Sequence, residues 1–264
     1  MAPAKGGPRE WDAESYDAVS DPQFEWGMEV LGRLELRGGE YALDAGCGSG
    51  RVTEELLERL PDGRVLAVDA SRAMIEKARE RLGDRASCLV ADLAELEVDE
   101  QVDLVFSTAT FHWVLDHERL FARLRAALRP GGRLVAQCGG KGNVAQHAAA
   151  IEAVAARPEF APHFGDETAA MWNFAGPEET EARLRAAGFA EARCWLEPKP
   201  VTPDDPLRFT MTATMVPQLA SLPEELRLPF AEAVLAESPK PLTLDYVRLN
   251  IEARARCRAP ATAL

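Results

Sequence analysis

The first 140 residues alternate short continuous apolar runs with segments whose apolar residues recur at helical spacing. The continuous runs predict buried strands, and the segments between them predict helices that begin at cap residues such as Ser71 and Asp116. Short strands separated by helices of about 10–15 residues pair in parallel through crossovers. The pattern therefore predicts an open sheet with helices on both faces. Its strands are expected at 41–43, 64–69, 87–91, 102–107 and 133–138.

Beyond residue 140 the pattern is less regular. It predicts helices over 144–156 and 177–187, a strand over 192–196 and a helix that starts at 223. In the last segment, 247–258, apolar residues at odd positions alternate with polar residues at even positions. This period of two predicts a strand with one face on a core and the other in polar surroundings. The arginines at 254, 256 and 258 are interpreted as a solvated strand face, with an anion-binding patch as the alternative.

Composition and charge narrow the class of protein. The formal net charge is −13, whereas nucleic-acid binding needs clustered Lys and Arg, so no nucleic-acid partner is expected. No apolar run approaches the roughly 18 residues of a spanning helix, and the N-terminus lacks the apolar core of a secretion signal. The five cysteines are widely spaced without a C-x-x-C pair. We therefore expect a cytoplasmic protein with reduced thiols, no metal site and no membrane segment.

The first predicted strand runs into Asp44-Ala-Gly-Cys-Gly-Ser-Gly50. Glycines in such a turn let the backbone bend tightly and let a ligand approach closely. The helix that follows presents free amide N–H groups and the positive end of its dipole to an anionic group. A dinucleotide-binding fingerprint starting at Gly46 would need a third glycine at position 51, which is Arg51. The spacing therefore argues against a nicotinamide cofactor.

Two acidic residues follow the next strands. Asp69 closes the second strand, where a carboxylate can accept both hydroxyls of a ribose. Asp92 follows the third strand, where a carboxylate can accept from the exocyclic amine of an adenine. In open parallel sheets, ligands bind beyond the carboxyl ends of the strands. Three such features at three successive strand ends predict one nucleoside-binding cleft.

The segments LDAGCGSG, AVDAS, ADL and LRPGGRLV together resemble the motif set of class I S-adenosylmethionine-dependent methyltransferases. The similarity covers residues 41–138. WDAESYD and FHWVLDHERLF are further similar to the trans-aconitate methyltransferase group. The resemblance implies an α/β, Rossmann-like open sheet, mostly parallel with an antiparallel last strand, helices on both faces and a helical lid.

The same resemblance implies a role for individual positions. S-adenosyl-L-methionine would be the cofactor, and a small molecule would accept its methyl group. Asp44 and the Gly46–Gly50 loop would hold the methionine part, and Asp69 the ribose. The cofactor-binding residues implied are Tyr16, Asp44, Gly46, Gly48, Gly50, Asp69, Ala70, Met74, Asp92, Leu93 and Thr108.

The reaction of such enzymes is an in-line displacement in which protein groups supply orientation and exclusion of water. A carboxylate acceptor needs no catalytic base, whereas a hydroxyl or a carbon acid needs one. His112, after the fourth strand, is the candidate base, with contact to the acceptor and a structural role as alternatives. Trp113 is interpreted as a wall or core aromatic. His117 is expected on the surface at a helix start.

The chain is expected to divide into an N-terminal helical lid segment (1–40), a cofactor-binding core (41–140) and a C-terminal part (141–264) with a lid insertion at about 198–241. Aromatic and Arg residues outside the regular alternation are candidates for contact with the acceptor. They are Trp11, Trp26, Trp113, Trp172, Phe174, Arg208 and Phe209. Two other functions stay open: a nicotinamide-dependent oxidoreductase and a non-catalytic methyltransferase-like binding protein. The sequence defines neither the acceptor nor the oligomeric state.

Overall fold

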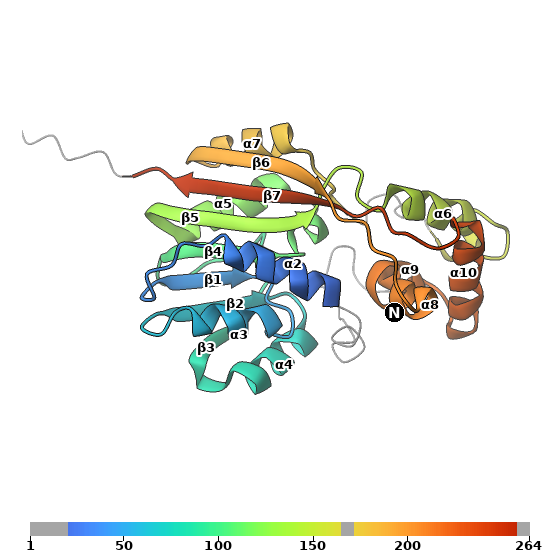
Figure 1. The fold of residues 1–264 in the computed structure, drawn as a ribbon, viewed down its shortest axis with the longest axis horizontal. Coiled ribbons are helices and arrows are strands. Elements are labelled where there is room, and N and C mark those ends of the chain that lie inside the picture. Colours follow the sequence, from blue (N-terminus) through green and yellow to red (C-terminus); the bar gives the residue numbers. More distant parts are fainter. Residues whose placement is uncertain (1–20, 165–171, 258–264) are drawn as a thin grey trace, which may run out of the picture.

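The computed structural model describes residues 21–164 and 172–257, which build one seven-stranded sheet with the order β3-β2-β1-β4-β5-β7-β6 (Figure 1). Neighbouring strands from β3 to β5 pair in parallel, whereas β7 lies antiparallel between β5 and β6. The predicted α/β sheet with an antiparallel last strand is therefore confirmed. The strands are β1 (Tyr41–Ala45), β2 (Arg64–Asp69), β3 (Ala86–Val90), β4 (Val102–Thr108), β5 (Leu128–Gly139), β6 (Phe189–Pro198) and β7 (Val247–Ala255).

Helices cover both faces of the sheet, and each face has its own apolar core (Figure 1). One core contains the apolar faces of α2 (Asp21–Gly32), α3 (Arg51–Glu58) and α4 (Arg72–Leu82). The other contains those of α5 (His117–Ala127) and α7 (Pro177–Ala186). The predicted caps are confirmed, because Ser71 accepts from the Met74 amide (3.3 Å) and Asp116 from the Arg119 amide (2.9 Å).

A separate helical body lies beyond one end of the sheet (Figure 1). It consists of α6 (Ala145–Ala155), α8 (Pro206–Phe209), a π-helical turn (Thr210–Thr214), α9 (Val216–Ser221) and α10 (Glu224–Glu237). Apolar residues of α6, α9 and α10 share one buried cluster. The body follows β5 and interrupts the chain between β6 and β7. Since β5 and β6 run in the same direction, it lies at the carboxyl ends of the parallel strands, where ligands bind in such sheets.

The sequence pattern predicted polar surroundings for the even-numbered face of β7. The structure shows such surroundings for only part of that face. Arg254 and Arg256 are exposed, but Arg248 and Asn250 are 2% and 0% exposed. The reason is that β7 is an interior strand, and α2 covers the first half of this face. The buried polar groups bond one another instead of water. Position 258 lies outside the described residues.

Asn250 is at the centre of this buried polar group. Its Oδ1 accepts from Gln137 Nε2 (3.0 Å) and from Arg33 Nη1 (2.6 Å). Arg248 Nε donates to Gln137 Oε1 (3.4 Å), and its guanidinium lies 4.7 Å from the centroid of the Trp26 ring. Buried polar groups are tolerated when they are hydrogen-bonded in this way. The network ties α2 to β5 and β7.

Asn250→Ala should therefore lower the free energy of unfolding by about 3 kcal/mol, because it leaves buried donors of Gln137 and Arg33 without their acceptor. Arg254→Ala, on the exposed half of the same face, is the matched control and should change it by less than about 0.5 kcal/mol. Urea unfolding of both variants measures this difference. Equal losses would contradict the network's role.

Candidate active site

Glycines at the end of β1 adopt backbone conformations that other residues avoid. Gly46, Gly48 and Gly50 have φ angles of +89°, +55° and +84°. A Cβ on Gly46 would lie 2.1 Å from Thr110 Oγ1, so close packing requires glycine there. A Cβ on Gly48 would meet no atom of the described chain within 4 Å. The loop is therefore packed on one side at Gly46 and open at Gly48.

The tip of β2 holds this loop in place. The Gly46 and Cys47 amides donate to the carbonyl oxygen of Val68 (2.7 and 2.9 Å). The Gly48 amide donates to Asp69 Oδ2 (2.9 Å), and the Ser71 amide donates to Oδ1 (2.9 Å). The ends of β1 and β2 thus meet as the sequence predicts. The Asp69 carboxylate is fixed beside the open side of the glycine loop.

Asp44 is a buried acid directly beneath the loop. It is 2% exposed, and its Oδ2 accepts from the hydroxyl of Thr53 (2.7 Å) in the first turn of α3. Burial raises the pKa of Asp44 to about 7, and the negative charge of Asp69 also raises it, against the opposing hydrogen bond from Thr53. A neighbouring cation would favour the charged form. The site can therefore stabilise a positively charged group near β1.

The segment that follows β4 lies against the glycine loop. Thr110 Oγ1 lies 3.1 Å from the Gly46 carbonyl oxygen and 2.9 Å from that of Thr108, so its hydroxyl joins the two strand ends. Ala109 has a φ of +55°, which a residue with a Cβ rarely adopts, and its amide donates to the Gln137 carbonyl (2.7 Å). Backbone strain of this kind clusters at functional sites. Thr53 and Thr110 were not among the predicted site residues. Their only signal is a hydroxyl, in the first turn of α3 for Thr53 and two residues past β4 for Thr110.

The predicted adenine-side residues lie around the tips of β2 and β3. The Ala91 amide donates to the Asp69 carbonyl (3.0 Å), which brings the segment containing Asp92 next to β2. Asp92 is exposed and accepts from the Ala94 amide (2.8 Å), and Ala70 is half-buried. Met74 and Leu93 are buried, and Leu93 belongs to one of the two apolar cores of the sheet. The predicted cofactor residues that lie within the described residues therefore surround the ends of β1 to β4.

Four rings form an aromatic cluster beside these strand ends: His112, Trp113, Trp172 and Phe174. The His112 ring stacks on Phe174 (5.7 Å between centroids) and lies 5.0 Å from Trp113. Trp172 stacks on Phe174 at 5.6 Å and 11°. His112 is only 7% exposed, and its Nδ1 accepts from the Gly139 amide (3.2 Å). The structure thus brings three predicted acceptor contacts together with the candidate base.

The remaining predicted positions lie away from this cluster or outside the described residues. His117 is not a surface residue: it is 2% exposed, and its Nε2 bonds the Phe111 carbonyl (3.0 Å). Its ring turns inward at the start of α5, and burial lowers its pKa. Arg208 is exposed on α8, and Trp26 and Phe209 are buried together in one apolar cluster. Trp11 and Tyr16 lie outside the described residues.

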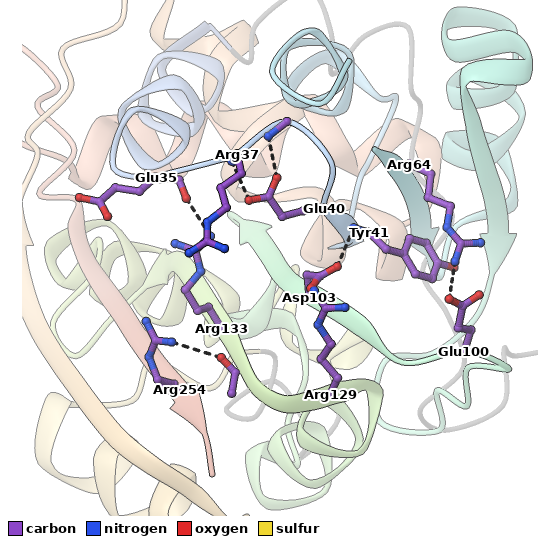
Figure 2. Close-up of polar contacts among 12 residues, drawn as sticks. Glu35, Arg37, Glu40, Tyr41, Arg64, Glu100, Asp103, Arg129, Arg133 and Arg254 are labelled. Atoms are coloured by element: carbon purple, nitrogen blue, oxygen red, sulfur yellow. Dashed lines mark hydrogen bonds and ion pairs between the residues drawn. The ribbon is translucent and has the colours of Figure 1, made fainter. Parts of the chain in front are cut away.

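At the opposite end of the sheet, where the parallel strands begin, charged and polar side chains pair with one another (Figure 2). There the Tyr41 amide donates to Asp103 Oδ2 (2.9 Å), Arg129 pairs with Asp103, and Arg64 pairs with Glu100 (2.5 Å). A cavity of about 270 Å³ lies among these residues. Because they lie at the amino end of β1 and β4, and ligands bind at carboxyl ends, this cavity is not the cofactor site.

Residues 21–164 and 172–257 contain no group of three His, Cys, Asp or Glu side chains that could hold a metal ion. Over the same ranges no helix is long and apolar enough to cross a membrane.

Comparison with known proteins agrees with this geometry. Residues 43–136 match a family model described as a methyltransferase domain. The trans-aconitate 2-methyltransferase of Methylobacterium nodulans is 34% identical over 179 residues, or 68% of this chain and 69% of that protein. Its counterpart in Variovorax paradoxus is 39% identical over 48% of this chain and 49% of that protein.

A structure of Haemonchus contortus phosphoethanolamine N-methyltransferase 2 with S-adenosyl-L-methionine shares the fold, with a TM-score of 0.58 and 20% identity. The match covers 93% of this chain and 57% of that one. The chain therefore belongs to the S-adenosylmethionine-dependent methyltransferases, and within them to the family of the trans-aconitate 2-methyltransferases. It is an enzyme that uses S-adenosylmethionine as cofactor, which sets aside the nicotinamide and non-catalytic alternatives.

The raised pKa of Asp44 makes stability depend on pH. Between pH 3.8 and about 7 the folded protein keeps a proton that the unfolded chain releases, so the free energy of unfolding falls as pH rises through this window. Asp44→Asn cannot ionise and should lose this dependence. Relative to wild type, the variant without cofactor should gain about 2 kcal/mol between pH 5 and pH 8, measured by urea unfolding. A constant difference at the two pH values would contradict the assignment.

Proposed function

We propose that this methyltransferase transfers the methyl group of S-adenosylmethionine to a carboxylate oxygen of a small polycarboxylic acid, with trans-aconitate as the first candidate. The observation that carries the cofactor site is the 2.9 Å hydrogen bond from the Gly48 amide to Asp69, beside the open space at Gly48. The acceptor is proposed because the similar proteins of Methylobacterium nodulans and Variovorax paradoxus are trans-aconitate 2-methyltransferases. Both parts of the proposal can be tested separately.

The glycine loop and Asp44 hold the amino-acid end of the cofactor in this proposal. The start of α3 directs its amides and dipole at a carboxylate, and the buried acid Asp44 favours a nearby ammonium group. Asp69 accepts from the ribose hydroxyls, and Asp92 from the adenine amine. The Asp69 carboxylate already accepts from the Gly48 and Ser71 amides. Ribose hydroxyls would share its oxygens with these amides, so cofactor binding needs only a local change in hydrogen bonding.

The cofactor, when bound, supplies an electrophilic methyl group on a sulfonium. The protein's contribution is to align the acceptor oxygen with that methyl group and to exclude water, which can supply effective molarities of roughly 10⁵ M or more. A carboxylate is already ionised at neutral pH, so the reaction needs no proton acceptor. The aromatic cluster supplies an apolar wall, and the helical body closes the site as a lid. Residues 41–140 form the cofactor-binding part.

Purified enzyme incubated with S-adenosylmethionine and trans-aconitate should yield S-adenosylhomocysteine and a methyl ester in equal amounts, detected by mass spectrometry. Mild alkali should return the original acid, because esters hydrolyse and C- or N-methyl groups do not. A panel of other di- and tricarboxylic acids shows the selectivity. Methylation of none of these acids, with active cofactor binding, would overturn the proposed acceptor.

Two Asp variants separate cofactor binding from acceptor choice. Asp69→Ala removes a carboxylate that two charge-assisted hydrogen bonds would use, so affinity for S-adenosylhomocysteine should fall by about 100-fold or more. Asp62→Ala, exposed between α3 and β2 at the opposite end of the sheet, is the control and should bind as wild type does. Calorimetry on both variants reports the result without any acceptor.

A further inference from the structure

The aromatic cluster is built from two segments that are far apart in the sequence. His112 and Trp113 belong to the 3-10 turn that follows β4, whereas Trp172 and Phe174 belong to residues 172–176, which we call the bridging segment. Each ring of one segment pairs with a ring of the other, at 5.7 Å for His112 and Phe174 and at 6.0 Å for Trp113 and Trp172. The shape of the cluster therefore depends on what holds the two segments together.

One end of the bridging segment is fixed by the core of the protein. The Lys141 amide, just past the end of β5, donates to the Ala175 carbonyl (2.9 Å). Ala175 is 1% exposed and belongs to the apolar core that contains α5 and α7. Gly176 is the N-cap of α7. These contacts fix the last two residues of the segment, whereas both rings lie on residues 172–174.

Asn173 holds the end that carries the rings. Its backbone amide donates to the His112 carbonyl (2.9 Å), and its side-chain Nδ2 donates to the Leu115 carbonyl (2.8 Å). Trp172 and Phe174, on either side of Asn173, stack on each other at 5.6 Å and 11°, so their rings share one side of the chain. The two hydrogen bonds of Asn173 thus attach this ring pair to the turn after β4.

Gly139, the last residue of β5, lies directly against one of these rings. A Cβ there would lie 2.7 Å from Phe174 Cε1, inside the roughly 3.5–4.0 Å separation of carbon atoms in contact. The φ angle of Gly139 is not positive, so the close approach of the ring, and not the backbone conformation, requires glycine here. The Phe174 ring therefore packs on the backbone at the end of β5.

The cluster lies next to the proposed cofactor site. The turn Phe111–Trp113 directly follows Thr110, whose hydroxyl donates to the Gly46 carbonyl (3.1 Å). Aromatic faces give apolar contact to the carbon skeleton of a small acid and exclude water from it. Three rings of the cluster are half-buried and so keep some accessible surface: Trp113, Trp172 and Phe174.

We propose that Asn173 is a positioning residue that holds the aromatic wall of the acceptor site, and that Gly139 sets the distance of this wall from the end of β5. Asn173 acts through Trp172 and Phe174 and does not itself need to touch the acceptor. The inference rests on the proposed function, because it takes the acceptor to be a small acid bound against these rings. It places part of the acceptor selectivity in the bridging segment, outside the cofactor-binding motifs.

Asn173→Ala removes the bond to Leu115 and keeps the backbone bond to His112. KM for an acid that the enzyme methylates should rise about fivefold or more, the effect of losing one neutral hydrogen bond, with kcat within about threefold of wild type. Affinity for S-adenosylhomocysteine should not change. Gln101→Ala is the matched control, because the Gln101 side-chain amide also donates to a backbone carbonyl, that of Ala126 (3.0 Å), but at the amino end of the sheet. It should change none of these constants.

Gly139→Ala acts on the same wall from the side of β5. The added Cβ displaces the Phe174 ring by about 1 Å, so KM for the acid should again rise about fivefold or more at unchanged affinity for S-adenosylhomocysteine. Residues that act on the same contact are not additive. The double variant with Asn173→Ala should therefore raise KM by less than the product of the two single effects.

Circular dichroism tests the inference without turnover. Trp113 and Trp172 are close enough for their indole transitions to couple, which gives paired bands of opposite sign in the far-ultraviolet spectrum. Trp172→Phe should remove these bands and so identify them. Asn173→Ala should weaken them, and Gln101→Ala should leave them as in wild type.

The outcomes that count against the inference are distinct from one another. Unchanged indole bands in Asn173→Ala, or weakened bands with an unchanged KM, overturn it. A parallel loss of affinity for S-adenosylhomocysteine overturns it in favour of a general structural role, and fully multiplicative effects in the double variant show that the two residues do not share a wall. Wild-type enzyme that methylates none of the acids overturns the proposed function instead, while the indole bands still report whether Asn173 holds the rings.

Discussion

The hydrogen bond between the Gly48 amide and the Asp69 carboxylate is the constraint on which the site depends. It joins the tips of β1 and β2, and it requires a positive φ at Gly48 and a carboxylate at the end of β2. The same carboxylate is proposed to meet the ribose, so the group that shapes the loop is also a ligand. On the other side of the loop, Thr110 fits against Gly46 so closely that no side chain is possible there. Two neighbouring strands thus fix the glycine loop from both sides.

Much of the fold could be predicted from local patterns. Strand positions, the caps Ser71 and Asp116, and the antiparallel last strand follow from periodicity, cap chemistry and motif spacing. The polar face of β7 and the burial of His117 could not be predicted, because both depend on which helix covers them in three dimensions. Asn is a residue type usually found at the surface. Asn250 is tolerated in the core because Gln137 and Arg33 donate hydrogen bonds to it. Thr53 and Thr110 were missed for the same reason.

Cofactor binding and acceptor binding are proposed to use different parts of the molecule. The strand tips hold groups that suit an adenosine with an amino-acid tail, and these groups come from residues 44–110. The helical body is built from segments after β5 and lies beyond the same end of the sheet (Figure 1), and the aromatic cluster lies beside those strand ends. One fold of this kind can host many different functions.

The most direct test of the account is a crystal structure of the enzyme with S-adenosylhomocysteine. The account predicts the ribose hydroxyls on the Asp69 carboxylate and the amino-acid tail against the loop from Gly46 to Gly50. Ligand density at the amino end of the sheet instead, in the cavity beside Tyr41 and Asp103, would contradict it.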